Sequence, residues 1–154
     1  MQSDTTTPVP AKEIAALLQP LLVDLVALAL NGKQAHWHVQ GRHFTQIHEQ
    51  LDVVVADARR AVDQVAERVV ALGVPVDGRP AAVASTTHLP DFDHGFLDDE
   101  KVVRGVLDQL DGVIKQGRQV LEPLGELDPI SQDIVIEVLR TLEKHRWMFA
   151  AQAS

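Results

Sequence analysis

The sequence contains no cysteine among its 154 residues. This absence excludes disulfide bonds, thiolate metal sites and thiol nucleophiles together. Any bound metal ion must therefore be held by histidine, aspartate and glutamate. A chain without disulfides also suits a reducing compartment, so we expect a cytoplasmic protein.

Aromatic residues are scarce as well, because they make up only 4% of the chain and tyrosine is missing. Apolar residues reach 45% and are mostly leucine, valine and alanine, a composition that suits packed helices better than a β-sandwich. A chain of this length most simply forms one domain. We therefore expect an all-α protein.

Positive charge is in short supply, since 22 acidic residues outnumber 14 lysines and arginines and leave a net charge of −8. Nucleic acid and anionic membranes attract clustered basic residues, so small cations are the more natural ligands. The N-terminus has no basic stretch followed by an apolar one. The most apolar later run, residues 21–30, is interrupted by Asp24 and is expected to be too short to span a bilayer.

The chain also has no Gly-rich phosphate loop and no nucleophile elbow, so phosphoryl transfer and acyl-enzyme chemistry have no support. What it does have is helical periodicity. A first helix is predicted over about residues 14–39, and Pro20 either kinks it or marks its first turn. A second is predicted over about residues 44–73, ending at Gly73. Residues 1–10, rich in threonine and proline, are predicted to be a disordered tail.

The second half of the chain predicts another pair of helices. Residues 74–96 contain too many prolines and glycines for one helix and are too long for a tight turn, so they form a long crossover. Asp98 caps a third helix, and Asp128 followed by Pro129 opens a fourth. Two hairpins joined by a long crossover between the second and third helices are the ferritin-like variant of the four-helix bundle. We expect this bundle over residues 11–152.

Five potential metal ligands are regularly spaced in the first hairpin. The four on the second helix form two pairs, each four residues apart, and all four share one helix face. The two pairs are eleven residues apart, roughly 16 Å along the axis, whereas the ligands of one iron or zinc ion lie about 2 Å from it. One helix therefore cannot bring both pairs to the same ion. The five residues are His36 on the first helix and His48, Asp52, Asp63 and Glu67 on the second.

A second copy of the chain resolves this difficulty. When the second helices of two copies lie antiparallel across a two-fold axis, Asp63 and Glu67 of one face His48 and Asp52 of the other, and two identical sites form. His36 lies at the same end of the hairpin as His48. Mixed histidine and carboxylate ligands suit Fe(II), Mn(II) or Zn(II), and oxygen-rich sets favour iron or manganese over copper. The alternative is that the acids form a solvated helix face and the histidines are incidental.

The segment KQAHWHVQGRHFTQIHEQLD, residues 33–52, and its continuation VDQVAERVVALG, residues 62–73, resemble the Dps family, the miniature ferritins also called DNA-protection-during-starvation proteins. The family motif is a histidine before a tryptophan, then His-x3-Asp, then Asp-x3-Glu eleven residues on. The five ligand candidates match all of it. The C-terminal KHRWMF, residues 144–149, extends the resemblance over nearly the whole chain.

This resemblance implies a hollow homododecamer with 23 symmetry, in the cytoplasm and in contact with the nucleoid, that stores iron. Its intersubunit ferroxidase sites, two per dimer, are expected to oxidise Fe(2+) to Fe(3+) with hydrogen peroxide, and its cavity to hold the ferric mineral. Such a protein would protect the cell and its DNA from oxidative stress. Asp63, Glu67 and the neighbour's His36 would hold the tighter iron, with His48 and Asp52 completing a weaker site.

The resemblance also suggests roles for residues outside the metal site. Trp37 would intercept stray oxidising equivalents, and packing at a subunit interface is a compatible alternative. Four acids near the start of the last helix would line a three-fold pore that concentrates cations, although a solvated helix start explains them equally well. These acids are Glu126, Asp128, Asp133 and Glu137.

The remaining histidines show no partner spacing. Two of them, His38 and His43, are expected at the surface or at an interface, with His43 a candidate surface metal ligand. Trp147 is expected to pack in the core or at an interface. The five remaining histidines are His38, His43, His88, His94 and His145.

Direct DNA binding is not expected, although some members of the family bind DNA through basic tails. Lys12 is the only basic residue among the first thirteen, and none follows Arg146. A shell of twelve chains would carry a formal charge of about −96 and repel phosphate. Two other functions stay open. One is a metal-dependent hydrolase that activates water at the same site, and the other is a non-catalytic DNA-compacting scaffold, against which the charge argues.

Overall fold

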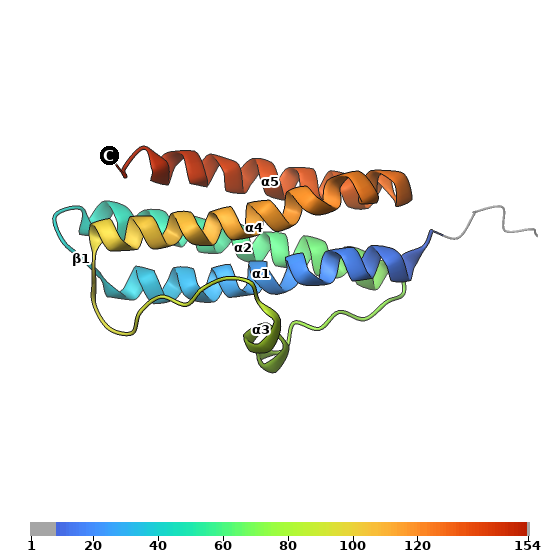
Figure 1. Cartoon of the computed structure of the whole chain (residues 1–154), viewed down its shortest axis with the longest axis horizontal. Helices are drawn as coiled ribbons and strands as arrows, with labels where there is room; N and C mark the ends of the chain where they lie inside the picture. Colours follow the sequence, from blue (N-terminus) through green and yellow to red (C-terminus); the bar gives the residue numbers. More distant parts are fainter. Residues whose placement is uncertain (1–8, 154) are drawn as a thin grey trace, which may run out of the picture.

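The computed structural model describes residues 9–153, so the tail predicted over residues 1–10 lies almost entirely outside the described residues. Four long helices pack side by side, and a short helix lies outside them on the connection between the two hairpins (Figure 1). The predicted all-α four-helix bundle with a long crossover is therefore confirmed. The helices are α1 (Ala11–His38), α2 (Phe44–Ala71), α3 (Pro80–Thr86), α4 (Asp99–Leu127) and α5 (Pro129–Ala150).

The helix ends follow the predicted signals closely. The Asp98 side chain accepts a hydrogen bond from the Lys101 N–H at 2.7 Å and so caps α4. Asp128 caps α5 in the same way, immediately before Pro129 at the first helical position. Pro20 lies inside α1, which begins at Ala11, so the alternative that this proline marks the first turn is wrong.

The crossover contains structure that the sequence did not predict. Besides α3, it ends in a two-residue strand, β2 (Leu97–Asp98), which pairs in parallel with β1 (Val39–Gln40) between α1 and α2. This pairing ties the α1–α2 turn to the start of α4. Gly41 follows β1 with φ +129°, and a Cβ there would lie 2.7 Å from the Asp99 carboxylate, so only glycine fits this turn without strain.

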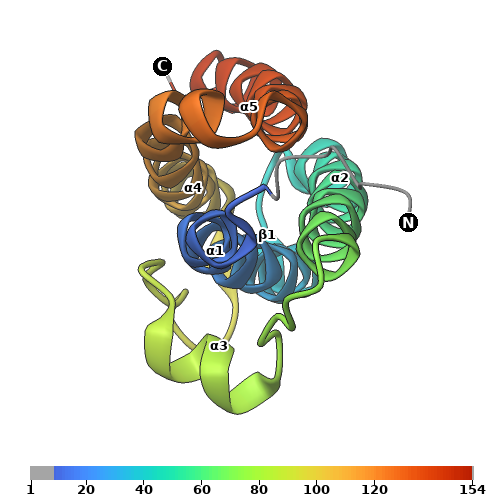
Figure 2. The same cartoon turned by 90° about the vertical axis from the view of Figure 1, so that its right-hand side faces the viewer.

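Helix α1 is the central helix, packed against α2, α4 and the crossover (Figure 2). By length and composition it could cross a membrane, which corrects the expectation that its apolar stretch is too short. Most of its apolar window is buried inside the bundle instead. Asp24 interrupts that stretch and is fully buried, and its carboxylate accepts hydrogen bonds from the Thr87 hydroxyl at 2.8 Å and the His88 N–H at 2.9 Å. The crossover therefore satisfies the one acid buried in α1.

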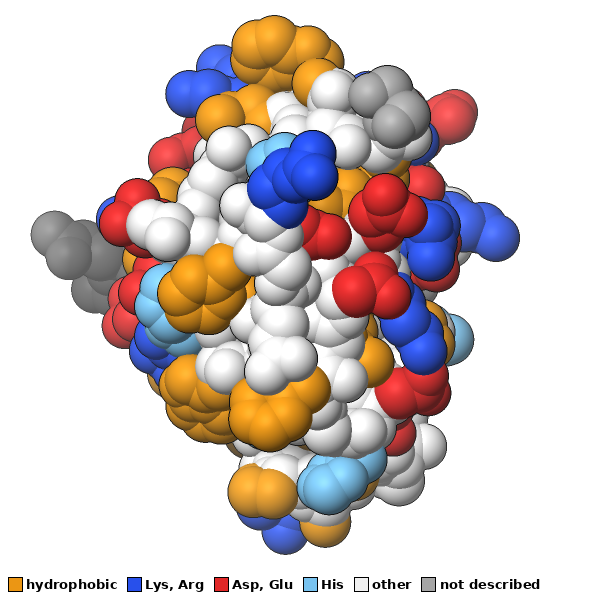
Figure 3. All heavy atoms as spheres, turned by 90° about the vertical axis from the view of Figure 1, so that its left-hand side faces the viewer, with side chains coloured by type: hydrophobic (Ala, Val, Ile, Leu, Met, Phe, Trp, Pro, Cys, Tyr) orange, Lys and Arg blue, Asp and Glu red, His pale blue; other side chains and the backbone are white. Residues whose placement is uncertain are grey.

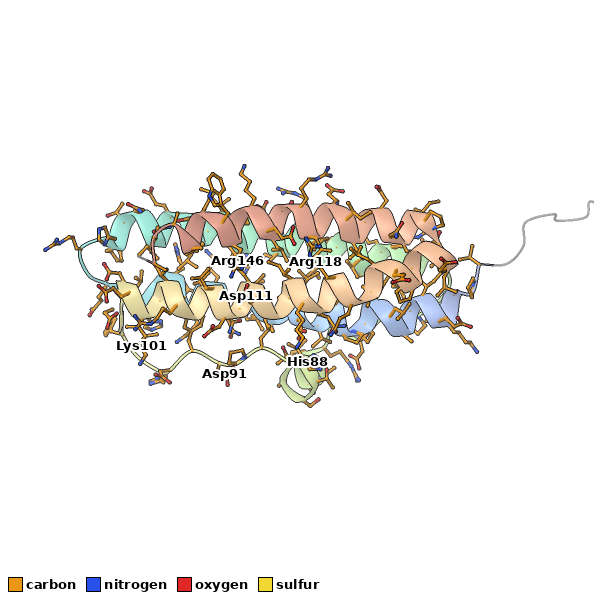
Figure 4. The ribbon with its side chains drawn as sticks, turned by 45° about the horizontal axis from the view of Figure 1, so that its top comes forward. His88, Asp91, Lys101, Asp111, Arg118 and Arg146 are labelled. Carbon is orange, nitrogen blue, oxygen red and sulfur yellow. The ribbon has the colours of Figure 1, made fainter. Side chains whose placement is uncertain are left out.

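The α4–α5 hairpin is bridged at its surface by two arginine pairs. Arg146 on α5 donates to Asp111 on α4 at 2.5 Å, and Figure 4 shows the two side chains facing each other across the seam. Arg118 on α4 donates to Glu143 on α5 at 2.7 Å. Exposed pairs of this kind contribute about 0–1 kcal/mol each, so buried apolar contacts hold the hairpin together.

The seam between α2 and α5 is polar even in its interior. The His145 ring Nε2 lies 2.6 Å from the Asp57 carboxylate, and Arg68 donates to Asp128 at 2.6 Å. Both His145 and Asp128 are about 5% exposed. A buried polar group is costly without a partner, and these pairs therefore fix how α5 sits on α2.

Candidate metal centre

His36 and His48 form a preorganised pair at the turn end of the first hairpin. Nδ1 of His36 lies 2.6 Å from the backbone oxygen of His48, and Nδ1 of His48 lies 2.7 Å from the backbone oxygen of His36. The two rings stack with centroids 3.6 Å apart and planes inclined by 13°. Since a carbonyl oxygen can only accept, each Nδ1 carries a proton and donates it.

These hydrogen bonds decide what the rings can do chemically. A neutral imidazole that donates from Nδ1 keeps a lone pair on Nε2, which is the arrangement found in metal-binding histidines whose other nitrogen is fixed by a carbonyl. His36 is 7% exposed, and Asp52 lies beyond it with Oδ1 3.6 Å from His36 Nε2. The single chain thus places three of the five predicted ligands at the turn end of the hairpin, without forming a complete metal site.

Asp52 is paired with a residue that the sequence analysis did not single out. Lys33, one turn before His36 on α1, donates from Nζ to Asp52 Oδ1 at 2.5 Å. This hydrogen bond lowers the pKa of the Asp52 carboxyl from its usual value of 3.8. Asp52 is therefore a carboxylate at neutral pH. The signal for Lys33 was its spacing of three from His36, which places both on one side of α1.

Asp63 and Glu67 are exposed on α2, one helical turn apart, and no hydrogen bond or ion pair joins either to another described residue. They lie farther along the helix than Asp52 by roughly 16 Å. Accordingly, residues 9–153 of one chain contain no group of three or more histidine, aspartate or glutamate side chains that could hold a metal ion. The two predicted ligand pairs remain separate in one subunit.

The acids near the start of α5 differ from one another. Glu126, Asp133 and Glu137 are exposed, and Glu137 meets only Gln64 at 3.5 Å. Asp128 is buried, and its carboxylate accepts hydrogen bonds from Ser131, Arg68 and the cap N–H groups. The helix cap therefore accounts for Asp128, and the pore prediction depends on the other three acids.

Three of the histidines for which the sequence showed no partner lie beside an aspartate in the fold. They are His43 with Asp99, His88 with Asp24 and His145 with Asp57. Each partner comes from a segment at least 56 residues away, so no local spacing could reveal it.

Both tryptophans are largely exposed in the subunit. Trp37, next to His36, is 62% exposed, and Trp147 is 67% exposed. The expectation that Trp147 packs in the core of the subunit is therefore wrong. The other expectation, packing at a subunit interface, stays a prediction.

Comparison with known proteins places this geometry in a family. The family model for the ferritin-like domain, Ferritin, matches residues 15–154. The chain is similar to the DNA protection during starvation protein of Mycolicibacterium smegmatis, with 35% identity over 92% of this chain and 77% of that protein. It is also similar to the fine tangled pili major subunit of Haemophilus ducreyi, with 37% identity over 90% of this chain and 73% of that protein.

Among solved structures, Dps from Microbacterium arborescens in the high iron form is 38% identical over 96% of this chain and 97% of that chain, with a TM-score of 0.91. The shared length and the helical bundle agree with one another. The chain belongs to the Dps family of ferritin-like proteins.

Proposed function

We propose that this protein is an iron-storage ferroxidase. It binds Fe(II) at sites shared between two subunits, oxidises it with hydrogen peroxide, and keeps the ferric product inside a homododecameric shell of 23 symmetry. Iron is the substrate and cargo of the reaction. The site residues are His36, His48, Asp52, Asp63 and Glu67.

The observation that carries the proposal is the pair of crossed hydrogen bonds between the two histidines. Each Nδ1 is held by the other residue's carbonyl at 2.6–2.7 Å, which leaves both Nε2 atoms as electron-pair donors, and Nε2 of His36 lies 3.6 Å from the ionised Asp52. The carbonyl contacts set this tautomer, and it is the one that metal-binding histidines present to an ion. The two further carboxylates on the same face of α2 then complete a site only when a second subunit supplies them.

Exposed apolar side chains beside the ligands support a second copy as the partner. Leu30 and Trp37, two turns apart on α1, are 60% and 62% exposed, and Val53 on α2 is 52% exposed. Such residues mark an association surface when they cluster. A two-fold contact over α1 and α2 would bury them and bring Asp63 and Glu67 towards the neighbour's histidines.

In this reaction the protein binds the iron ions and supplies negative charge, while the electrons pass from iron to peroxide. One hydrogen peroxide molecule accepts two electrons, one from each of two Fe(II) ions, its O–O bond breaks, and the oxygen atoms leave as water or hydroxide. Carboxylates favour Fe(III) over Fe(II) because they neutralise its added charge, which makes Asp63 and Glu67 the residues that draw the reaction forward. Lys33 must release Asp52 when iron binds there.

The exposed acids Glu126, Asp133 and Glu137 are proposed to line the route by which iron enters. A ring of carboxylates at a three-fold axis would raise the local concentration of Fe(II). Trp37 is proposed to accept stray oxidising equivalents next to His36. These two roles are separable from the site itself.

We propose that the protein acts in the cytoplasm, near the nucleoid, without binding DNA directly. The net charge of −8 per chain repels phosphate. Protection of DNA would then come from removing Fe(II) and peroxide together. A gel shift at low salt that retarded DNA would contradict this part of the proposal and favour the scaffold alternative.

The decisive experiment is anaerobic loading of metal-free protein with Fe(II), followed by a peroxide pulse, with ferric absorbance and particle mass recorded together. Fast oxidation in a particle of twelve subunits is expected, and Asp63→Ala/Glu67→Ala should abolish it without changing the mass. The matched control is Asp108→Ala/Glu122→Ala, which removes two exposed acids of α4 outside the site and should oxidise iron at the wild-type rate.

If the wild type and both double variants oxidise iron equally slowly, the ferroxidase proposal is refuted. The hydrolase alternative would then be favoured. The particle mass tests the shell independently. An open-ended fibre, the kind of assembly that the name of the Haemophilus relative denotes for that protein, would refute the closed dodecamer.

A further inference from the structure

A cavity of about 760 Å³ lies at the turn end of the bundle, apart from the metal ligands. Three segments enclose it: the turn and first residues of α2, the first residues of α4, and the C-terminal end of α5. Figure 3 shows this end of the molecule, where basic and acidic side chains lie interspersed. The cavity is lined by Arg42, His43, Gln46, Ile47, Asp99 and Arg104, among others.

The cavity wall is fixed by contacts already described at the turn. The Asp99 carboxylate accepts the His43 backbone N–H at 2.9 Å and lies 3.2 Å from Nδ1 of the same histidine. Gly41 makes room for this carboxylate, since any side chain would collide with it. On the opposite wall, Gln46 donates to Gln152 at 3.1 Å, which holds the end of α5 in place.

Two arginines supply the positive charge of the cavity. Arg42 and Arg104 both line it, and no ion pair joins either to a carboxylate among residues 9–153. The hydrogen bond from the His43 N–H lowers the pKa of the Asp99 carboxyl, so this acid is ionised but already occupied. Glu100 is the one exposed acid of the lining.

A cation site is a poor fit here, although His43 looked like a surface metal ligand. The described residues hold no cluster of three histidine or acidic side chains able to ligate a metal ion. Two guanidinium groups, by contrast, match the geometry and charge of a tetrahedral oxyanion. We propose that this cavity binds a small oxyanion of the phosphate class, held by Arg42 and Arg104 with His43 and the glutamine amides as further donors.

Phosphate groups reach proteins either free or as part of a nucleic-acid backbone, and the cavity favours the free form. Duplex DNA presents an extended row of phosphates and needs a continuous basic surface. The end of the bundle in Figure 3 shows no such surface, because acidic side chains lie between the basic ones. Two arginines that line one cavity are better suited to a single small anion.

The test is a titration of iron-free wild-type protein with inorganic phosphate, followed by the ³¹P NMR line width. Iron must be absent because ferric ions bind phosphate themselves. Saturable broadening is expected for the wild type. Arg42→Gln/Arg104→Gln should weaken binding by more than about tenfold, since two charge-assisted contacts are lost. Glu100→Gln should tighten it by about threefold, because a nearby like charge is removed.

The matched control is Arg140→Gln, an exposed arginine on α5 outside the cavity, which should bind phosphate as the wild type does. Circular dichroism and particle mass verify that each variant is folded. Absence of saturable binding in the wild type, or equal binding by wild type and the double variant, would overturn the proposal. Fluorescence anisotropy with a short DNA duplex separates the two sources of phosphate. Duplex binding that the double variant loses would overturn the assignment to a free anion.

Discussion

The two groups of predicted ligands differ in how far one subunit has prepared them. His36, His48 and Asp52 are fixed by hydrogen bonds from α1 and α2, with His36 almost completely buried. Asp63 and Glu67 stand on the same helix, exposed and without partners among the described residues. The first group is held in place by the folded subunit itself, whereas the second can gain contacts only from a second subunit or a ligand. Substitutions should therefore separate stability from iron chemistry at these two places.

The largest effect is expected for His36→Ala. The change removes a buried ring, its stacking on His48 and the donor to the His48 carbonyl, so it should lower the free energy of unfolding by about 2–4 kcal/mol as well as abolish fast iron oxidation. Urea unfolding of the metal-free protein measures the first effect and stopped-flow absorbance the second. A variant that keeps full stability would show that the pair is not a structural element of the hairpin.

The double variant Asp63→Asn/Glu67→Gln should show the opposite pattern, with unchanged stability and slow iron oxidation. Both residues are exposed, so the free energy of unfolding should change by less than about 0.5 kcal/mol. Fe(II) oxidation should nevertheless slow by more than about a hundredfold, because the charge that favours Fe(III) is lost. The same two measurements apply. A large loss of stability would mean that these acids have partners inside the subunit.

A contrast of the same kind exists at the start of α5, between Asp128 and Asp133. Burial raises the pKa of Asp128, but hydrogen bonds from Ser131 and Arg68 outweigh it and hold the pKa below 3.8. Because the folded state then binds fewer protons than the unfolded state, this stabilisation is present above about pH 4 and is lost as pH falls through the lowered pKa.

Asp128→Asn keeps a capping side chain but loses the charge paired with Arg68. It should cost about 1–2 kcal/mol at pH 7 and flatten the fall in unfolding free energy below about pH 4. Asp133→Asn should leave both quantities unchanged, because that side chain is exposed. Unfolding curves at a series of pH values test this pair. Equal acid sensitivity in both variants would contradict the assignment.

The smallest effect is expected for Lys33→Met. Asp52 is half-exposed, so its ion pair with Lys33 is weak, and freeing the carboxylate should raise Fe(II) affinity at the weaker site by about fivefold or less. Anaerobic equilibrium dialysis at low iron measures this change. Weaker binding in Lys33→Met would instead make the lysine a positive contributor to the site.

The sequence predicted most of the fold because most of it is local. The apolar periods gave α1 and α2, and Asp98 and Asp128 marked the starts of α4 and α5 through caps that need only neighbouring residues. The β1–β2 pairing and α3 were missed. Each consists of a few residues whose structure depends on segments far along the chain.

For the site, helix geometry was enough to predict five ligand candidates and to show that Asp52 and Asp63 cannot meet in one chain. It could not show that His36 and His48 exchange hydrogen bonds, since this depends on how closely α1 and α2 pack. The partners of His43 and His145 were hidden for the same reason.

The anchoring of the crossover has a consequence for assembly. A connection of this length would let the α4–α5 hairpin of one chain exchange with that of another, a three-dimensional domain swap. The crossover is instead fastened to its own α1 through Gln19 with Asp77 and through Asp24 with Thr87, and it ends in the β1–β2 clasp. Subunits can then share surfaces while each keeps its own helices, so disassembly should yield intact bundles rather than exchanged halves.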